Sequence, residues 1–206
     1  MQIRPKLAFG VLALAVLATP LAAKEKTGFD AEKYEIFQQT FADTCTFEGD
    51  FMPPPEERVE TFEFTFQRDW EGAEPETVTV HQFHCFSGAY NLVSVFFIDD
   101  DAEGFRPLPF AQPELDIVHT DPDDFESPVE SIAIAGYSAT LQLVNAEVDA
   151  ESGTISSHSL WRGIGDASSS AVYRHAEGQF VLHRYEVDAS YDGEINPETL
   201  IDLGGD

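Results

Sequence analysis

Residues 77–98 read TVTVHQFHCFSGAYNLVSVFFI, and this stretch decides the fold of the chain. Its first half, Thr77–Phe86, is rich in β-branched and aromatic residues, and its second half, Asn91–Ile98, contains an almost continuous apolar run. Ser87–Tyr90 is short enough to connect them as a hairpin. The pattern therefore predicts two antiparallel strands, with Leu92–Ile98 as a central strand covered on both faces.

Period-two alternation marks a further strand upstream of this hairpin, where Phe62, Phe64 and Phe66 alternate with polar residues. Downstream, strand-like segments separated by short turns indicate antiparallel neighbours. These segments are Ser131–Tyr137, Thr140–Val148, Ile155–Trp161, Ala171–His175 and Gln179–Val187. The chain is therefore predicted to be mainly β, as an antiparallel sheet or sandwich.

One N-terminal helix is expected over Ala31–Asp43, because its aromatic residues repeat at helical spacing and Asp30 can cap it. The stretch Phe105–Pro128 contains several prolines and an acidic cluster. It is predicted to be an irregular, exposed loop with room for a short edge strand.

The N-terminus has the pattern of a secretory leader. Two basic residues precede the apolar run Leu7–Leu17, and small residues up to Ala23 close it. The run is shorter than the roughly 20 residues of a membrane-spanning helix. We expect a signal peptide over residues 1–23, a single β-rich domain over residues 24–206, a periplasmic or secreted location, and no membrane insertion after cleavage.

The chain has two cysteines, Cys45 and Cys85. In an oxidising compartment an even pair is expected to be bonded, which predicts a disulfide between them. His81 and His84 next to Cys85 suggest zinc as an alternative. Residues three apart on a strand point to opposite faces, which disfavours a shared metal.

Composition restricts the partners. The chain has 38 acidic and 11 basic residues, for a formal net charge of −27. Such a chain repels nucleic acid and anionic lipid, and it attracts a cationic ligand or a basic partner protein. A solvated surface that only keeps the protein soluble is the alternative interpretation.

One acidic segment resembles part of a calcium loop. Asp188, Ser190 and Asp192 stand at alternate positions before Gly193. Thr199 occupies the position where a closing acid belongs, and a plain turn explains the Asp-Gly equally well. The sequence therefore predicts no cofactor, with calcium at this segment as the alternative.

Four motifs carry a resemblance to a known family. They are Cys85–Asn91, Pro107–Phe110, Arg162–Asp166 and Phe180–Leu182. In this order they resemble, from about Cys45 to the C-terminus, a secreted bacterial family catalogued as domain of unknown function 1176. The resemblance implies an exported, β-rich, disulfide-containing protein without an established activity.

The resemblance also implies a second disulfide position in relatives. Members of the family commonly carry a cysteine where this chain has Ala167, and another near Ala189 and Ser190. Both are missing here, and joint loss is what a bonded pair predicts. Ala167 is therefore interpreted as a structural position, and the adjacent Gly-Asp as a turn.

The function expected from the sequence is that of a non-enzymatic binding or accessory protein of the cell envelope. Candidate contact residues are Tyr90 and Asn91 in the first glycine motif and Trp161, Arg162 and Asp166 around the second. Core packing of the aromatic residues and an ion pair of the arginine are the alternatives. Two other classes stay open: an envelope hydrolase and a calcium-stabilised structural domain. The hydrolase would use Asp166 with another carboxylate or with His158.

Overall fold

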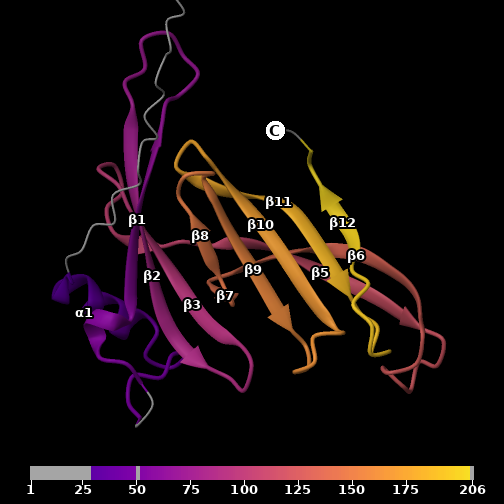
Figure 1. The fold of residues 1–206 in the computed structure, drawn as a ribbon. Coiled ribbons are helices and arrows are strands. Elements are labelled where there is room, and N and C mark those ends of the chain that lie inside the picture. The colour runs from indigo at the N-terminus through magenta and orange to yellow at the C-terminus, as the bar shows by residue number, and fades with distance from the viewer. Residues whose placement is uncertain (1–28, 50–51, 205–206) are drawn as a thin grey trace, which may run out of the picture.

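A computed structural model describes residues 29–49 and 52–204, and this part of the chain is mainly antiparallel β-structure with one α-helix (Figure 1). The predicted signal peptide, residues 1–23, lies outside the described residues. Among the residues described, no helix is long and apolar enough to cross a membrane. The predicted fold class, mainly β with one N-terminal helix, is confirmed.

Helix α1 spans Ala31–Thr40, and a short 3-10 helix, Pro55–Glu57, precedes the first strand. The strands are β1 Val59–Phe66, β2 Glu76–Ser87, β3 Leu92–Asp99, β4 Arg106–Pro107, β5 Phe110–His119, β6 Val129–Thr140, β7 Gln142–Val144, β8 Glu147–Asp149, β9 Thr154–Leu160, β10 Ser168–Ala176, β11 Gln179–Asp188 and β12 Glu198–Asp202.

The strands form two five-stranded sheets and a two-stranded ribbon (Figure 1). The first sheet has the order β1-β2-β3-β4, with β7 pairing with β3, and the second has the order β12-β11-β10-β9-β8. Strands β5 and β6 pair with each other as the ribbon. The predicted hairpin is present, because β2 and β3 pair antiparallel.

Strand β3 is buried on both faces and separates two hydrophobic cores. Phe96 and Ile98 point into the core between the sheets, whereas Val95 and Phe97 point towards α1. The helix begins where the Asp30 carboxylate accepts the first backbone N–H groups, and its Phe37 is fully buried. The helix therefore covers the outer face of the first sheet.

The prediction of an irregular loop over Phe105–Pro128 is wrong. Ten of these residues form β5, which pairs with β6. Pro113 is accommodated because β5 pairs with one neighbour, so a residue without an N–H can face the open edge of the ribbon. The expected break after Tyr137 is also absent, because β6 continues to Thr140. The sequence had not indicated β12.

The predicted disulfide between Cys45 and Cys85 is confirmed. It ties the segment after α1 to β2, and Arg58 reinforces the connection. The buried Arg58 guanidinium donates to the carbonyl oxygens of Thr46 (2.7 Å) and His84 (3.0 Å). The helix is thus fastened to the first sheet by a covalent bond as well as by packing.

Loss of this disulfide should lower the free energy of unfolding. The bridge joins residues 40 apart, and the chain-entropy model gives a contribution of about 4 kcal/mol for a loop of this size. We expect Cys45→Ala/Cys85→Ala to lose about this amount in urea unfolding monitored by circular dichroism. An unchanged unfolding midpoint would contradict the assignment of a stabilising role.

Candidate functional site

The structure brings the two glycine motifs together. The Tyr90 hydroxyl donates to the Trp161 carbonyl (3.4 Å), and the Tyr90 ring lies against Gly163, where an added Cβ would approach within 3.1 Å of the ring. Trp161 is half-buried against the main core, and its indole N–H donates to the Ser169 hydroxyl (3.4 Å). A side chain at position 163 would therefore push the tyrosine ring away by a few tenths of an ångström.

Asn91 connects the two sheets. Its side-chain amide donates to the Leu160 carbonyl (2.9 Å) and accepts from the Leu160 N–H (3.2 Å), as a neighbouring strand would. Asn145 also donates to Asn91 (3.0 Å), while its own oxygen accepts from Leu92 N–H (2.7 Å). The Asn91 amide is therefore hydrogen-bonded within the protein, and it stabilises the contact between the two sheets.

Arg162 and Asp166 form a bidentate ion pair. Arg162 Nε donates to Asp166 Oδ1 (2.6 Å) and Nη2 to Oδ2. Arg162 also donates to the Tyr191 carbonyl (2.8 Å), and the Gly193 N–H donates to Asp166 (2.8 Å). The pair thus joins the β9–β10 loop to the β11–β12 loop.

This pairing sets the protonation state of Asp166. The carboxylate is 1 % exposed, and the Arg162 hydrogen bonds, aided by the Gly193 N–H, lower its pKa to about 2. A carboxylate that stays ionised at neutral pH has no proton to give as a general acid. Both Asp166 oxygens are also engaged by Arg162 and by the Gly193 N–H, and His158 lies on β9 with an exposed side chain.

The Asp188 carboxylate is engaged with its own loop. Its oxygens accept from the Ser190 N–H (3.1 Å) and hydroxyl (2.7 Å) and from the Asn196 N–H (2.6 Å). Asp192 accepts from the Glu194 N–H (2.9 Å). Within the described ranges, no group of three or more His, Cys, Asp and Glu side chains could hold a metal ion. The contacts are those of a closed polar turn.

The Arg162–Asp166 pair should make stability depend on pH. The pKa of Asp166 in the folded protein, about 2, is below its ordinary value of 3.8, so its contribution is present above about pH 4 and is lost as pH falls towards 2. We expect Asp166→Asn to be less stable than the wild type at pH 7, with the difference shrinking over this interval. Urea unfolding at several pH values measures it.

The control is Asp43→Asn, which removes the same charge from an exposed position. It should change stability little at pH 7. A stability difference for Asp166→Asn that stays constant between pH 7 and pH 2 would contradict the role of the ionised carboxylate.

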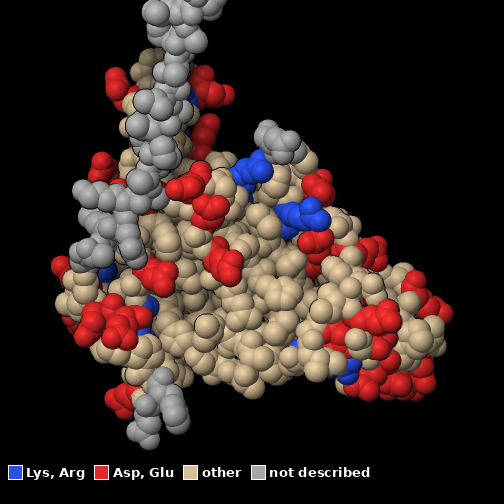
Figure 2. Space-filling view, in the orientation of Figure 1, with Lys and Arg blue, Asp and Glu red and all other residues tan. Residues whose placement is uncertain are grey.

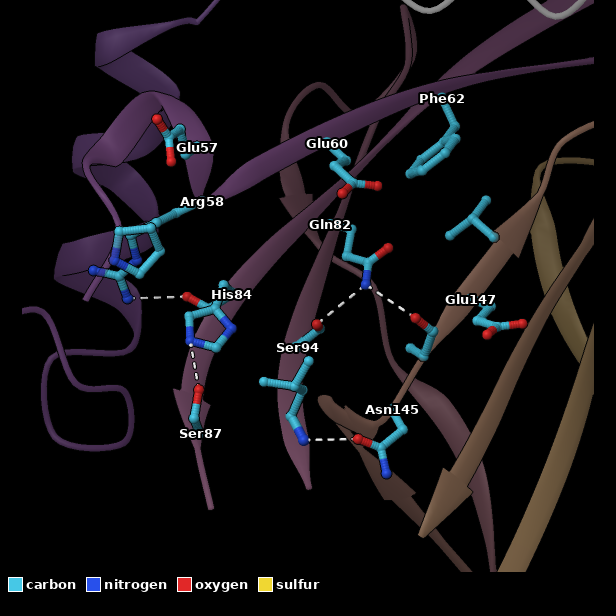
Figure 3. Close-up of a pocket in the computed structure, with 14 residues that line it drawn as sticks. Glu57, Arg58, Glu60, Phe62, Gln82, His84, Ser87, Ser94, Asn145 and Glu147 are labelled. Atoms are coloured by element: carbon cyan, nitrogen blue, oxygen red, sulfur yellow. Dashed lines mark hydrogen bonds between the residues drawn. The ribbon is translucent and has the colours of Figure 1, made fainter. Parts of the chain in front are cut away.

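A cavity of about 620 Å³ lies on the inner face of the first sheet (Figure 3). We call it the acidic cavity, because Glu57, Glu60 and Glu147 line it. The other lining residues are Pro53, Arg58, Phe62, Gln82, His84, Ser87, Leu92, Ser94, Asn145, Ala146 and Val148. They come from β1, β2, β3, β8 and adjoining connections.

The polar lining is positioned by internal hydrogen bonds. Gln82 Nε2 donates to the Ser94 hydroxyl (3.1 Å) and to the Ala146 carbonyl (3.3 Å), which leaves the Gln82 oxygen facing the space between Phe62 and Glu147 (Figure 3). A preorganised acceptor beside carboxylates suits a ligand that donates hydrogen bonds.

His84 and Ser87 line the same cavity. His84 Nε2 lies 3.2 Å from the Ser87 hydroxyl. Burial, and then the nearby Arg58 charge, lower the pKa of the imidazole. The neutral ring therefore adds no positive charge to the cavity at neutral pH.

The sequence-predicted contact residues lie largely outside this cavity. Of them, Asn91 borders it through Asn145, while Arg162 and Asp166 are joined to the β11–β12 loop. The sequence analysis missed Glu60, Gln82 and Glu147. A signal was present in β2, where the face that begins with Val78 and Val80 becomes polar at Gln82 and His84.

The fold is that of a mainly β protein, and the acidic cavity has a volume within the range of small-molecule pockets. The family described as Protein of unknown function (DUF1176) matches residues 75–195, and the chain belongs to it. No curated protein and no solved structure matches the chain.

The strand register bears on the two positions where the family resemblance implies a pair of cysteines. Ser168 at the start of β10 pairs with Asp188 at the end of β11. Ala167 and Ala189 are the next residues beyond this pair, one on each side, and both are buried. We expect Ala167→Cys/Ala189→Cys to form an internal disulfide on oxidation, because adjacent antiparallel positions lie within disulfide reach. Mass spectrometry of a non-reduced digest identifies the bridge. Two free thiols after oxidation would contradict this pairing.

Proposed function

We propose that this protein is an exported, non-enzymatic binding protein that holds a cationic ligand in the acidic cavity. The observation that carries the proposal is the arrangement of Glu60, Glu147 and the fixed Gln82 oxygen around one preformed space (Figure 3). Envelope location is supported by the leader-like N-terminus and by the disulfide, since disulfides persist in oxidising compartments.

The lining favours an organic ammonium group. Carboxylates and an amide oxygen accept hydrogen bonds from an amine, and the Phe62 ring offers a cation–π contact. A volume of about 620 Å³ is larger than a bare ion needs and lies in the range of small-molecule pockets. The ligand class is therefore an amine or a basic side chain rather than a metal ion.

The whole molecule assists such binding. The net charge is −27, and Asp and Glu outnumber Lys and Arg on the visible face (Figure 2). A field of this sign raises the local concentration of cations and their association rate, and salt screens it. The general attraction concerns any cation, so selectivity has to come from the cavity.

The test is calorimetric titration with spermidine at low ionic strength. Glu60→Gln/Glu147→Gln removes the negative charge from two acceptors and should weaken binding by at least about tenfold, because even one hydrogen bond to a charged group contributes about 1.5–3 kcal/mol. The matched control is Glu130→Gln/Glu151→Gln, which makes the same charge change at exposed positions outside the cavity.

The control should bind spermidine as the wild type does. Equal weakening in both double variants would mean diffuse surface attraction, and it would overturn the assignment of the cavity.

A further inference from the structure

A second cavity lies where the two sheets and the β5–β6 ribbon meet. Its volume is about 440 Å³, and its lining comes from β5 to β7 and from β9, β10 and β11. None of the residues that line it carries a formal charge. We call it the neutral cavity, and it contains Trp161, one of the contact residues that the sequence had suggested.

The absence of charge in this lining is informative because acids are abundant elsewhere. With 38 acidic residues in 206, a surface site without one is set apart from the rest of the molecule. A charged ligand that entered this cavity would lose its hydration and find no side chain of opposite charge, which costs free energy. The lining therefore favours a neutral ligand.

The polar groups in the neutral cavity are hydroxyls and amides. Ser157 donates to the Val144 carbonyl (3.1 Å), which leaves its oxygen as an acceptor. Burial raises the pKa of Tyr185, and contacts with Ser169 and Gln112 partly offset that rise. These groups both donate and accept, so they match a ligand with many hydroxyls.

Trp161 supplies an apolar wall. Its indole N–H donates to the Ser169 hydroxyl (3.4 Å), and this bond orients the ring. The residue is half-buried, so packing against the core fixes it while part of its surface reaches the cavity. A small number of precisely placed polar groups beside an aromatic surface is typical of a small-molecule site.

We propose that the neutral cavity binds an uncharged saccharide, with a sugar face against the Trp161 indole and its hydroxyl groups bonded to Gln112, Ser157 and Tyr185. A sugar ring combines an apolar face with a dense set of donors and acceptors. This site is separate from the acidic cavity, so its ligand does not depend on the function proposed there.

Tryptophan fluorescence tests the proposal directly, because the chain has two tryptophans. Trp70 lies between β1 and β2 and is 56 % exposed, so Trp70→Phe leaves Trp161 as the single reporter. The probe is tri-N-acetylchitotriose, a soluble neutral oligosaccharide. We expect a saturable change in the emission of Trp70→Phe protein.

Two neighbouring serines give a matched pair of variants in this background. Ser157 lines the cavity, whereas Ser156 is not among its lining residues and points to the opposite face of β9. Ser157→Ala should weaken the affinity about fivefold, and Ser156→Ala should leave it unchanged. Melting curves of both variants confirm that they are folded.

Glu60→Gln/Glu147→Gln should keep its affinity for the oligosaccharide, which separates this proposal from the function proposed for the acidic cavity. Absence of a saturable emission change in the Trp70→Phe protein would overturn the saccharide site. Equal weakening by Ser156→Ala and Ser157→Ala would overturn it too, because binding would then not involve the cavity face of β9.

Discussion

The burial of β3 on both faces is the constraint on which the rest of the structure depends. Phe96 and Ile98 on one face need the second sheet as a cover, while Val95 and Phe97 on the other need α1. A strand that is apolar on both sides cannot border water, so both layers have to be present. The disulfide at Cys85 fastens the helical layer to the neighbouring strand β2, which pairs with β3 along its length.

The acidic cavity follows from the same sheet. Along β2, the inner face carries Val78 and Val80 where the second sheet covers it, and Gln82 and His84 further on. Polar side chains cost less where water can reach them, so the apolar half forms core and the polar half lines the acidic cavity. The pairing of Glu60 with Gln82 then places a carboxylate beside the fixed amide.

Local features were predictable from the sequence, and long-range features were not. The β2–β3 hairpin, the helix with its Asp30 cap and the disulfide depend on periodicity, capping and cysteine count. Strand β5 was missed because Pro113 within it and the prolines on either side indicate a loop until β6 is known to pair beside it. The sequence analysis singled out the glycine motifs, but only the folded structure shows that the Asp166 carboxylate is engaged by Arg162 and by the loop after β11.

Neither cavity was predicted, because each is lined by strands that are distant in the sequence. One short segment separates the two cavities. Gln142–Val144 borders the neutral cavity, and Asn145–Val148 borders the acidic one. Between these two parts, Asn145 adopts a positive φ of 44° and is held by Leu92 and by the carbonyl of His158. An Asn tolerates this conformation better than most residues. The bend there turns the chain from one cavity to the other, so an acidic and an uncharged cavity share a wall that hydrogen bonds keep in place.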